Sequence, residues 1–307
     1  MTDQTRTMPS LFTGLSAFPL TPIREEEIDE SAYIGLVERL VAAGVDSITA
    51  LGSTGSYVYL NLEERARVAQ LTVDHAAGLP VFVGIGALRT RDVLANVASA
   101  EAAGAQGLLL APVSYQPLTD NDVFELFRTV TSATDLPLVV YDNPGTTHFT
   151  FTTDLYARLA ELDGVASIKI PGLPLSPPEF RAHVDAIREA TGDTVGIGIS
   201  GDAFGAAGLS AGCGAWYTAV GGTLPTPMLE ITRAALAGEA EKAAELSAEL
   251  QPLWDLFTDL GGSLRVSAAI AEHLGLVAPN SLPLPILGLG DEEKTRVAEV
   301  VDRLGLT

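Results

Sequence analysis

Eight short apolar runs recur along the first three quarters of the chain, about 20–35 residues apart. This spacing is the length of one strand-plus-helix unit. The runs are continuously apolar rather than alternating, which is typical of strands that are buried on both faces. They begin at Phe12, Asp46, Val81, Gln106, Pro137, Val165, Thr194 and Ala215.

Segments with apolar residues at three- and four-residue spacing lie between these runs and predict helices. Eight strands alternating with helices favour a (β/α)8 TIM barrel, although periodicity alone does not exclude a doubly wound open sheet. Asp120, Thr153 and Ser176 are the expected N-cap residues. The predicted helices are Glu30 to Ala43, Leu62 to Ala77, Arg91 to Ala103, Asp120 to Ser132, Thr153 to Leu162 and Pro178 to Ala190.

The pattern changes after Val220, where helical segments follow one another with no strand between them. We therefore expect two parts, a catalytic barrel over residues 1–224 and a C-terminal helical domain over residues 225–307. The predicted helices of the second part are Thr226 to Leu236, Glu239 to Asp259, Ser263 to Leu274 and Asp291 to Leu304.

The net charge is -21, from 39 acidic against 18 basic residues. Such a field repels phosphate backbones and gives no attraction to anionic membranes, so we expect no nucleic-acid or membrane partner. The longest uncharged stretch, Ala203 to Leu229, contains Gly, Ser, Thr and two prolines. We interpret it as a buried strand with its loops rather than a membrane helix.

The single cysteine, Cys213, excludes an internal disulfide. Residues 1–10 carry no apolar signal core, so we expect no secretion signal and a cytoplasmic location. The four histidines are scattered, which gives no support for a metal site. The sequence GIGISG at Gly196 to Gly201 matches a dinucleotide motif by letter, but its glycines fall within the predicted strand, so we expect no such cofactor.

Lys169 is the most informative residue, because it is one of only three lysines and lies between two isoleucines in a predicted strand. Burial of an ammonium favours its neutral, nucleophilic form, as in Schiff-base enzymes. A structural lysine paired with a buried acid is the alternative. Lys242 and Lys294 lie in charged helical segments, where surface ion pairing explains them.

Two further motifs follow predicted strands, at the end where barrels place their active sites. The sequence GSTGS at Gly52 to Ser56 can direct backbone N–H groups at an anion, although an ordinary loop has similar composition. Tyr141 ends the run PLVVY and is a candidate proton donor or acceptor, or alternatively a core aromatic.

Taken together, GSTG, Tyr141 and Lys169 resemble the motifs of the dihydrodipicolinate synthase/N-acetylneuraminate lyase family, the class I pyruvate aldolases. The resemblance extends over GLSAFPLTP, LNLEER, VFVGIGALRT, GAQGLLLAP, VVYDNPG, VASIKIPG and ISGDA. It implies a (β/α)8 barrel with a C-terminal helical extension, a homotetramer built as a dimer of dimers, and no cofactor.

The resemblance also implies roles for individual residues. Lys169 would form a Schiff base with pyruvate or another 2-oxo acid, before reaction with an aldehyde. Tyr141 would transfer protons, and Thr54 would relay them through its hydroxyl. Ser53 and Thr54 would hold the substrate carboxylate. The implied pocket also takes in Gly201, Thr146, Trp216 and Tyr217, although one of the two aromatic residues is equally well explained by core packing.

The sequence departs from the family pattern at several positions, including Ser56, where the family usually has an acid, and the loop DNPGTT, which differs from that of the sialate lyases. Thr146 replaces an arginine that binds the second substrate's carboxylate in the true synthases, and a hydroxyl cannot form the same bidentate ion pair. Ser114, followed by Tyr115, replaces a tyrosine that reaches a neighbouring subunit's site. We therefore expect a Schiff-base lyase other than the lysine-pathway enzyme. The alternatives are 4-hydroxy-tetrahydrodipicolinate synthase, a 2-oxo-3-deoxy acid dehydratase or aldolase, and a non-catalytic relative that binds a 2-oxo acid.

Overall fold

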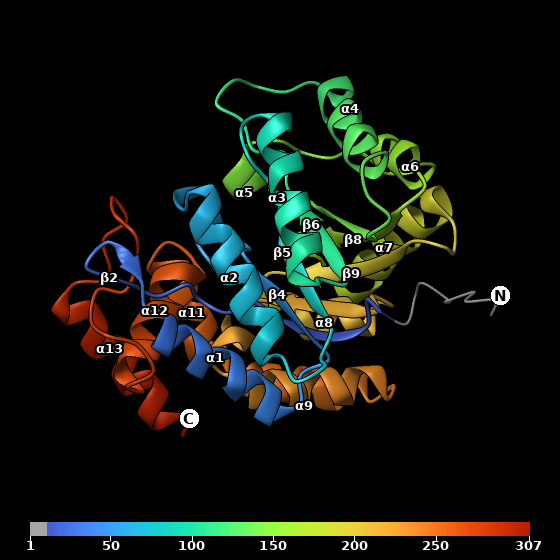
Figure 1. Cartoon of the computed structure of the whole chain (residues 1–307). Coiled ribbons are helices and arrows are strands. Elements are labelled where there is room, and N and C mark those ends of the chain that lie inside the picture. Colours follow the sequence, from blue (N-terminus) through green and yellow to red (C-terminus); the bar gives the residue numbers. More distant parts are fainter. Residues whose placement is uncertain (1–10) are drawn as a thin grey trace.

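Eight parallel strands form a closed barrel in the computed structural model, which describes residues 11–307 (Figure 1). Strand β1 pairs with both β4 and β10, which closes the sheet and excludes the open-sheet alternative. All eight predicted runs form these strands: β1 (Gly14–Ala17), β4 (Ser47–Ala50), β5 (Val81–Gly84), β6 (Gly107–Leu110), β7 (Leu138–Tyr141), β8 (Val165–Ile170), β9 (Gly196–Ser200) and β10 (Ala215–Thr218). A separate hairpin joins β2 (Ile23–Arg24) to β3 (Glu27–Ile28).

The predicted barrel helices form and end within two residues of the expected bounds. Two caps lie one residue earlier than predicted, because the Thr119 and Thr152 hydroxyls accept the N–H groups of Asp122 and Leu155. Ser176 is a cap as predicted. The helices are α1 (Glu30–Ala43), α2 (Leu62–His75), α3 (Thr90–Ala103), α4 (Asp120–Thr131), α5 (Pro144–Thr147), α6 (Thr153–Ala160), α7 (Pro177–Thr191) and α8 (Gly205–Ser210).

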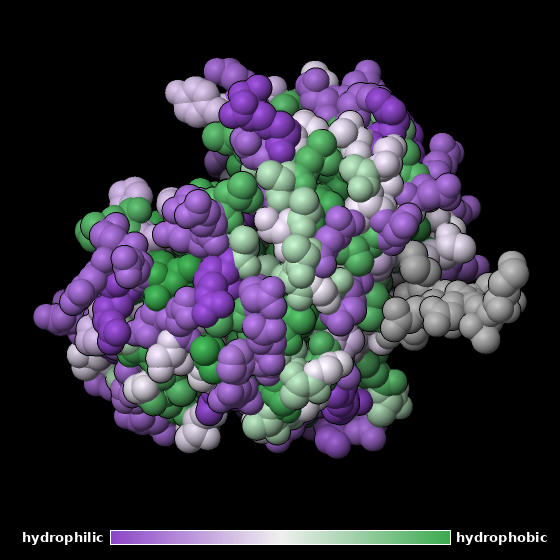
Figure 2. Space-filling view, viewed as in Figure 1, coloured by the Kyte–Doolittle hydropathy of each residue, from purple (hydrophilic) through white to green (hydrophobic). Residues whose placement is uncertain are grey.

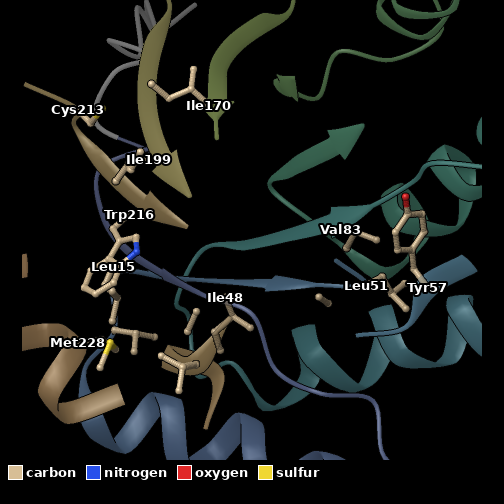
Figure 3. Packing of buried hydrophobic residues seen from close by; sticks show 14 of the residues in the cluster. Leu15, Ile48, Leu51, Tyr57, Val83, Ile170, Ile199, Cys213, Trp216 and Met228 are labelled. Atoms are coloured by element: carbon tan, nitrogen blue, oxygen red, sulfur yellow. The ribbon is translucent and has the colours of Figure 1, made fainter. Parts of the chain in front are cut away.

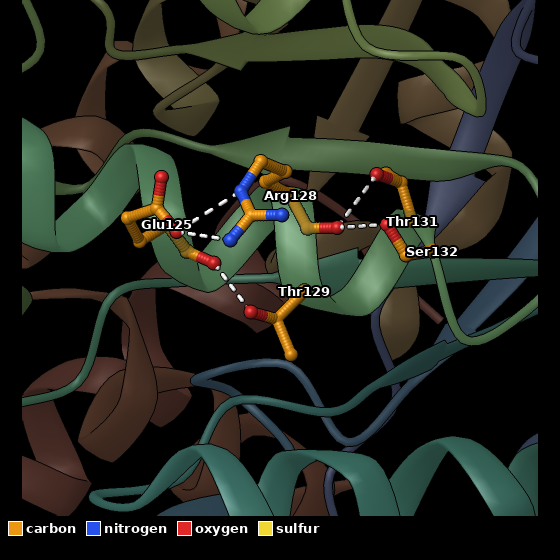
Figure 4. Close-up of polar contacts among 5 residues, drawn as sticks. All are labelled: Glu125, Arg128, Thr129, Thr131 and Ser132. Atoms are coloured by element: carbon orange, nitrogen blue, oxygen red, sulfur yellow. Dashed lines mark hydrogen bonds and ion pairs between the residues drawn. The ribbon is translucent and has the colours of Figure 1, made fainter.

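Hydroxyl groups cap the C-terminal end of α4 (Figure 4). The Thr131 and Ser132 hydroxyls donate to the Arg128 carbonyl at 3.3 and 2.7 Å. The Arg128 guanidinium also pairs with Glu125 one turn earlier. The Arg128 carbonyl also accepts the Ser132 backbone N–H, so the two hydroxyls add to the hydrogen bonding of the last helical turn.

The C-terminal part contains α9 (Pro225–Leu236), α10 (Ala240–Glu249), α11 (Gln251–Asp259), α12 (Ser263–His273) and α13 (Asp291–Arg303). The single helix expected over Glu239 to Asp259 is wrong: the chain turns at Leu250, because Pro252 has no N–H to donate within a continuous helix. Helix α9 packs on β1 and against α1 and α8, so it completes the ring of helices around the barrel. The division of the chain at residue 224 stays a prediction.

Successive strand residues alternate between the inside of the barrel and the layer under the helices. The inward layer gathers aromatic and small residues, among them Phe18, Phe82, Tyr141 and Tyr217. The outward layer is the larger core cluster, which joins the strands to the surrounding helices (Figure 3). The barrel is therefore filled with side chains, and the space for a ligand lies at the ends of its strands.

Hydrophilic residues are prominent over the outer helices on the face shown in Figure 2. No described helix is long and apolar enough to cross a membrane. The stretch from Ala203 to Leu229 holds the buried strand β10 as predicted, together with α8 and the start of α9. The prediction about residues 1–10 lies outside the described residues.

Candidate active site

Lys169 lies inside the barrel near the carboxyl end of β8 and is only 4% exposed. In the sheet register it is opposite Tyr141 of β7 on one side and Gly198 of β9 on the other. Its Nζ lies 3.9 Å from the centre of the Tyr141 ring and 5.6 Å from that of Phe18. The lysine thus lies against aromatic faces, and no carboxylate of residues 11–307 is within ion-pair distance of it.

Burial lowers the pKa of Lys169 to about 7, and the carboxylates of Asp202 and Asp142 oppose this shift. Loss of hydration disfavours the charged amine more than these two acids stabilise it. A lysine with this pKa is partly neutral near physiological pH. It can therefore act as a nucleophile without a separate base to deprotonate it.

The Tyr141 phenol oxygen is held by two polar side chains. It lies 3.2 Å from the Ser53 hydroxyl, and it accepts the Asn143 amide N–H at 2.8 Å. Burial raises the pKa of Tyr141, and these two hydrogen bonds oppose the shift. The hydroxyl bonded to Tyr141 is that of Ser53, whereas the resemblance had implied Thr54. Neighbouring residues in the tight turn direct their side chains differently, and the turn presents Ser53 to the phenol.

The GSTGS segment forms a tight turn directly after β4, in which the Ser56 N–H donates to the Ser53 carbonyl. Gly52 is required here, because a Cβ at this position would lie 2.3 Å from the Phe18 ring. Within residues 11–307, no protein group accepts a hydrogen bond from the backbone N–H of Ser53 or Thr54. These two groups are available to an anion in the adjacent cavity.

Two buried carboxylates flank the lysine. Asp202 follows β9 and accepts hydrogen bonds from the Thr218 hydroxyl and from the N–H groups of Ala219 and Val220. Asp142 accepts the Tyr156 hydroxyl at 2.5 Å, while its other oxygen has no hydrogen-bond partner in the described part of the chain. Burial raises the pKa of Asp142 to about 6. Both acids are held by neighbouring groups, so their charge acts on Lys169 through space.

Trp216 and Tyr217 occupy opposite faces of β10. Tyr217 faces into the barrel, where its hydroxyl lies 2.9 Å from that of Ser167. The prediction that Trp216 lines the pocket is wrong: its side chain is fully buried in the outer layer beside Leu15 and Met228 (Figure 3). Adjacent residues of a strand cannot both face the same side, so the equally weighted core-packing explanation holds for Trp216.

A cavity of about 660 Å³ opens at the carboxyl ends of the strands. Every predicted site residue except Trp216 lines it, namely Lys169, Tyr141, Thr54, Ser53, Gly201, Thr146 and Tyr217. The C-terminal helices complete the opposite wall, with Trp254 and Phe257 of α11 and with residues 261–264. This size suits a ligand larger than pyruvate.

Several lining residues were missed from the sequence. Asn143 and Asp202 each follow a strand closely, within the motifs YDNPG and ISGDA, so their position at the active end of the barrel was a usable signal. Trp254 and Phe257 carried no such signal, because nothing local indicates that α11 reaches over the barrel. Two glycines of GIGISG, Gly196 and Gly198, lie in β9, where Gly198 leaves room for the Tyr217 ring, and Gly201 directly follows the strand.

A closed barrel with a buried lysine beside a tyrosine at its active end defines a class of protein, the class I aldolase-type lyases that work through a Schiff base. Residues 11–304 match the model of the Dihydrodipicolinate synthetase family. The chain belongs to this family and is an enzyme of that class.

Known proteins resemble the chain over nearly its whole length. A solved structure from Agrobacterium tumefaciens, described as dihydrodipicolinate synthase, is 45% identical with a TM-score of 0.92, over 97% of this chain and 99% of that one. The 4-hydroxy-tetrahydrodipicolinate synthases of Aromatoleum aromaticum and Dechloromonas aromatica are 30% and 28% identical, each over 96% of this chain and 99% of the relative.

Proposed function

We propose that the protein binds pyruvate, or a related 2-oxo acid, as a Schiff base on Lys169 and joins it to an aldehyde or cleaves the corresponding product. The observation that carries this proposal is the buried Lys169, whose pKa is lowered to about 7 and whose Nζ lies against the Tyr141 ring. A buried amine that is neutral near pH 7 is suited to attack a keto carbon.

The neighbouring groups have complementary roles in this proposal. The backbone N–H groups of Ser53 and Thr54 bind the carboxylate of the 2-oxo acid. Lys169 attacks the keto carbon and water leaves, which gives a protonated imine. Tyr141, having given its proton to the departing water, takes one from the methyl group, which yields an enamine whose carbon adds to the aldehyde. The aldehyde oxygen takes a proton from the Tyr141 hydroxyl. The Ser53 hydroxyl, which is bonded to that phenol, helps to return a proton to it. Water then releases the product from Lys169.

Borohydride trapping with pyruvate tests the proposal directly. Reduction of the imine should leave a lactyl-sized mass increase, and peptide mapping should locate it on Lys169. Lys169→Ala should prevent the adduct, whereas Lys242→Ala should not, because Lys242 is an exposed lysine paired with Glu239. An adduct that persists in Lys169→Ala, or is absent with every 2-oxo acid in the folded protein, would overturn the proposal.

The names of the similar proteins favour a second candidate, 4-hydroxy-tetrahydrodipicolinate synthase itself. Thr146 weighs against it, because this side chain accepts the Asn143 amide at 3.0 Å and offers no charge to a second carboxylate. Rapid condensation of pyruvate with aspartate semialdehyde would establish this candidate. An adduct with a longer 2-oxo acid but not with pyruvate would indicate the dehydratase, and an adduct without turnover over a broad aldehyde panel would indicate a non-catalytic relative.

The homotetramer and the cytoplasmic location remain predictions. One solved relative, 28% identical, is described as a monomeric dihydrodipicolinate synthase variant, so the assembly varies between known proteins. Light scattering on the purified protein measures its assembly.

A further inference from the structure

The cavity is charged only at its floor. Among residues 11–307, Lys169 and Asp202 are the only charged side chains that line it. The aldehyde reacts with the enamine, in which the Lys169 nitrogen is neutral, so no cationic side chain that lines the cavity is left to pair with a second anion. The charges that remain nearby are those of Asp202 and Asp142, and both repel an anion. The reacting partner of the enamine would therefore be poorly bound if it carried a carboxylate or a phosphate.

The wall that α11 and the segment after it form carries large apolar side chains beside two small hydroxyl residues, Thr258 and Ser263. Trp254 and Phe257 form a tilted aromatic pair with ring centres 5.8 Å apart. The indole N–H of Trp254 donates to the Ser247 carbonyl at 2.8 Å, so it is not available to a ligand. Phe204, Leu264 and Ile286 also line this side of the cavity.

Loops that follow the strands add further apolar side chains to the rim. Val58 and Tyr59, after β4, line the cavity and are each 47% exposed, and Val113, after β6, lines it too. A ligand that covers such side chains is stabilised by removing their surface from water, at about 25 cal/mol per Å². Aromatic walls favour a flat partner, because rings pair in offset or edge-to-face arrangements.

We propose that the aldehyde that reacts at this site is uncharged and carries an apolar, aromatic body. This inference rests on the proposed Schiff-base function and specifies its second substrate. The enamine carbon bonds to the aldehyde carbon, and the electron pair of the broken carbonyl π bond goes to oxygen, which takes a proton from Tyr141. Water then hydrolyses the imine, which releases a 4-hydroxy-2-oxo acid with the aromatic group at C4 and regenerates the Lys169 amine.

Three aldehydes of different chemistry test the inference with pyruvate as the common partner: benzaldehyde (uncharged and aromatic), glyceraldehyde (uncharged and hydroxylated) and succinic semialdehyde (anionic). Benzaldehyde should give a kcat/KM at least about 10-fold above the other two. A preference for either of the others, or no product from benzaldehyde, would overturn the inference. Borohydride trapping with pyruvate on the same preparation distinguishes failure of this inference from failure of the proposed function. An adduct on Lys169 retains the proposed function, and the absence of an adduct overturns that function too.

Variants of the wall and the rim sharpen the test. Phe257→Ala should lower kcat/KM for benzaldehyde about 10-fold, whereas Phe124→Ala, a matched truncation of a half-buried phenylalanine on α4, should not change it. Thr146→Arg should raise kcat/KM for succinic semialdehyde relative to benzaldehyde at least about 10-fold, whereas the uncharged Thr146→Gln should not. Equal effects of Phe257→Ala and Phe124→Ala, or of the two Thr146 variants, would contradict the inference.

Discussion

Lys169 and Tyr141 are register partners on neighbouring strands, and the Lys169 Nζ lies 3.9 Å from the centre of the Tyr141 ring. The negative face of the ring attracts an ammonium, but burial disfavours the charge more strongly, and the pKa of Lys169 falls to about 7. The strand pairing thus brings a partly neutral amine next to a phenol that can exchange protons. Because both residues lie on rigid strands, this geometry does not depend on a mobile loop.

The depressed pKa of Lys169 predicts how stability varies with pH. In the unfolded chain the lysine titrates near 10.5, and in the folded protein near 7. Between these values the unfolded chain holds one more proton, so the free energy of unfolding rises with pH. Urea denaturation between pH 8 and 10 should show a slope about 1.4 kcal/mol per pH unit steeper for the unmodified protein than for Lys169→Met.

Lys242→Met is the control for this comparison, because Lys242 is 62% exposed and pairs with Glu239 one turn away on the surface. It should keep the slope of the unmodified protein. Parallel curves for the unmodified protein and Lys169→Met would show that Lys169 has an ordinary pKa in the folded state.

The Ser53 hydroxyl, 3.2 Å from the Tyr141 phenol oxygen, should matter for proton transfer. We expect Ser53→Ala to lower kcat about 10- to 100-fold, less than the roughly 10²- to 10⁴-fold typical of a direct general acid or base, because Ser53 acts through Tyr141. Ser53→Thr, which keeps the hydroxyl, should restore most of kcat. Thr54→Val, which keeps the backbone N–H that binds the carboxylate and leaves the Ser53 hydroxyl in place, should lower kcat far less than Ser53→Ala does. The reverse outcome for Ser53 and Thr54 would reinstate Thr54 as the relay.

Asp142 should tune the pKa of Lys169. Its pKa of about 6 leaves it ionised at neutral pH, where its charge raises the pKa of the lysine. Asp142→Asn removes that charge, so the pH at which borohydride trapping is half-maximal should fall below that of the unmodified protein. Asp135→Asn makes the same charge change on an exposed loop before β7 and should leave the midpoint unchanged. An unchanged or higher midpoint in Asp142→Asn would exclude the through-space effect.

Trp216 should contribute to stability and not to substrate binding. Its side chain is fully buried outside the barrel, where a Cβ added to Gly205 would lie 2.2 Å from the indole ring. Trp216→Phe leaves a cavity in this tightly packed layer, and we expect it to lower the free energy of unfolding by about 1–3 kcal/mol. The KM values for pyruvate and the aldehyde should not change. A changed KM without loss of stability would show that Trp216 contacts the substrate and would contradict this placement.

Local patterns in the sequence predicted the architecture and the centre of the site. Eight buried runs at regular spacing predicted the barrel. Continuous apolar runs indicate parallel strands covered on both faces, and their spacing leaves room for one helix after each strand. Lys169 was recognisable because burying an ammonium between isoleucines costs free energy, which indicates a functional role for the amine. The prediction that Trp216 lines the pocket failed because both faces of a barrel strand are apolar, so composition cannot tell which face turns inward.

What the sequence by itself determined is the order of strands and helices, together with the lysine, tyrosine and GSTGS turn at the ends of particular strands. The tertiary structure alone decided that Ser53 rather than Thr54 meets Tyr141, that Asp202 and Asp142 lie near Lys169, and that α11 forms an apolar wall of the cavity. These features depend on contacts between residues far apart in the chain. Periodicity and composition describe only neighbours in sequence, whereas such contacts are set by the packing of the whole barrel with its C-terminal helices.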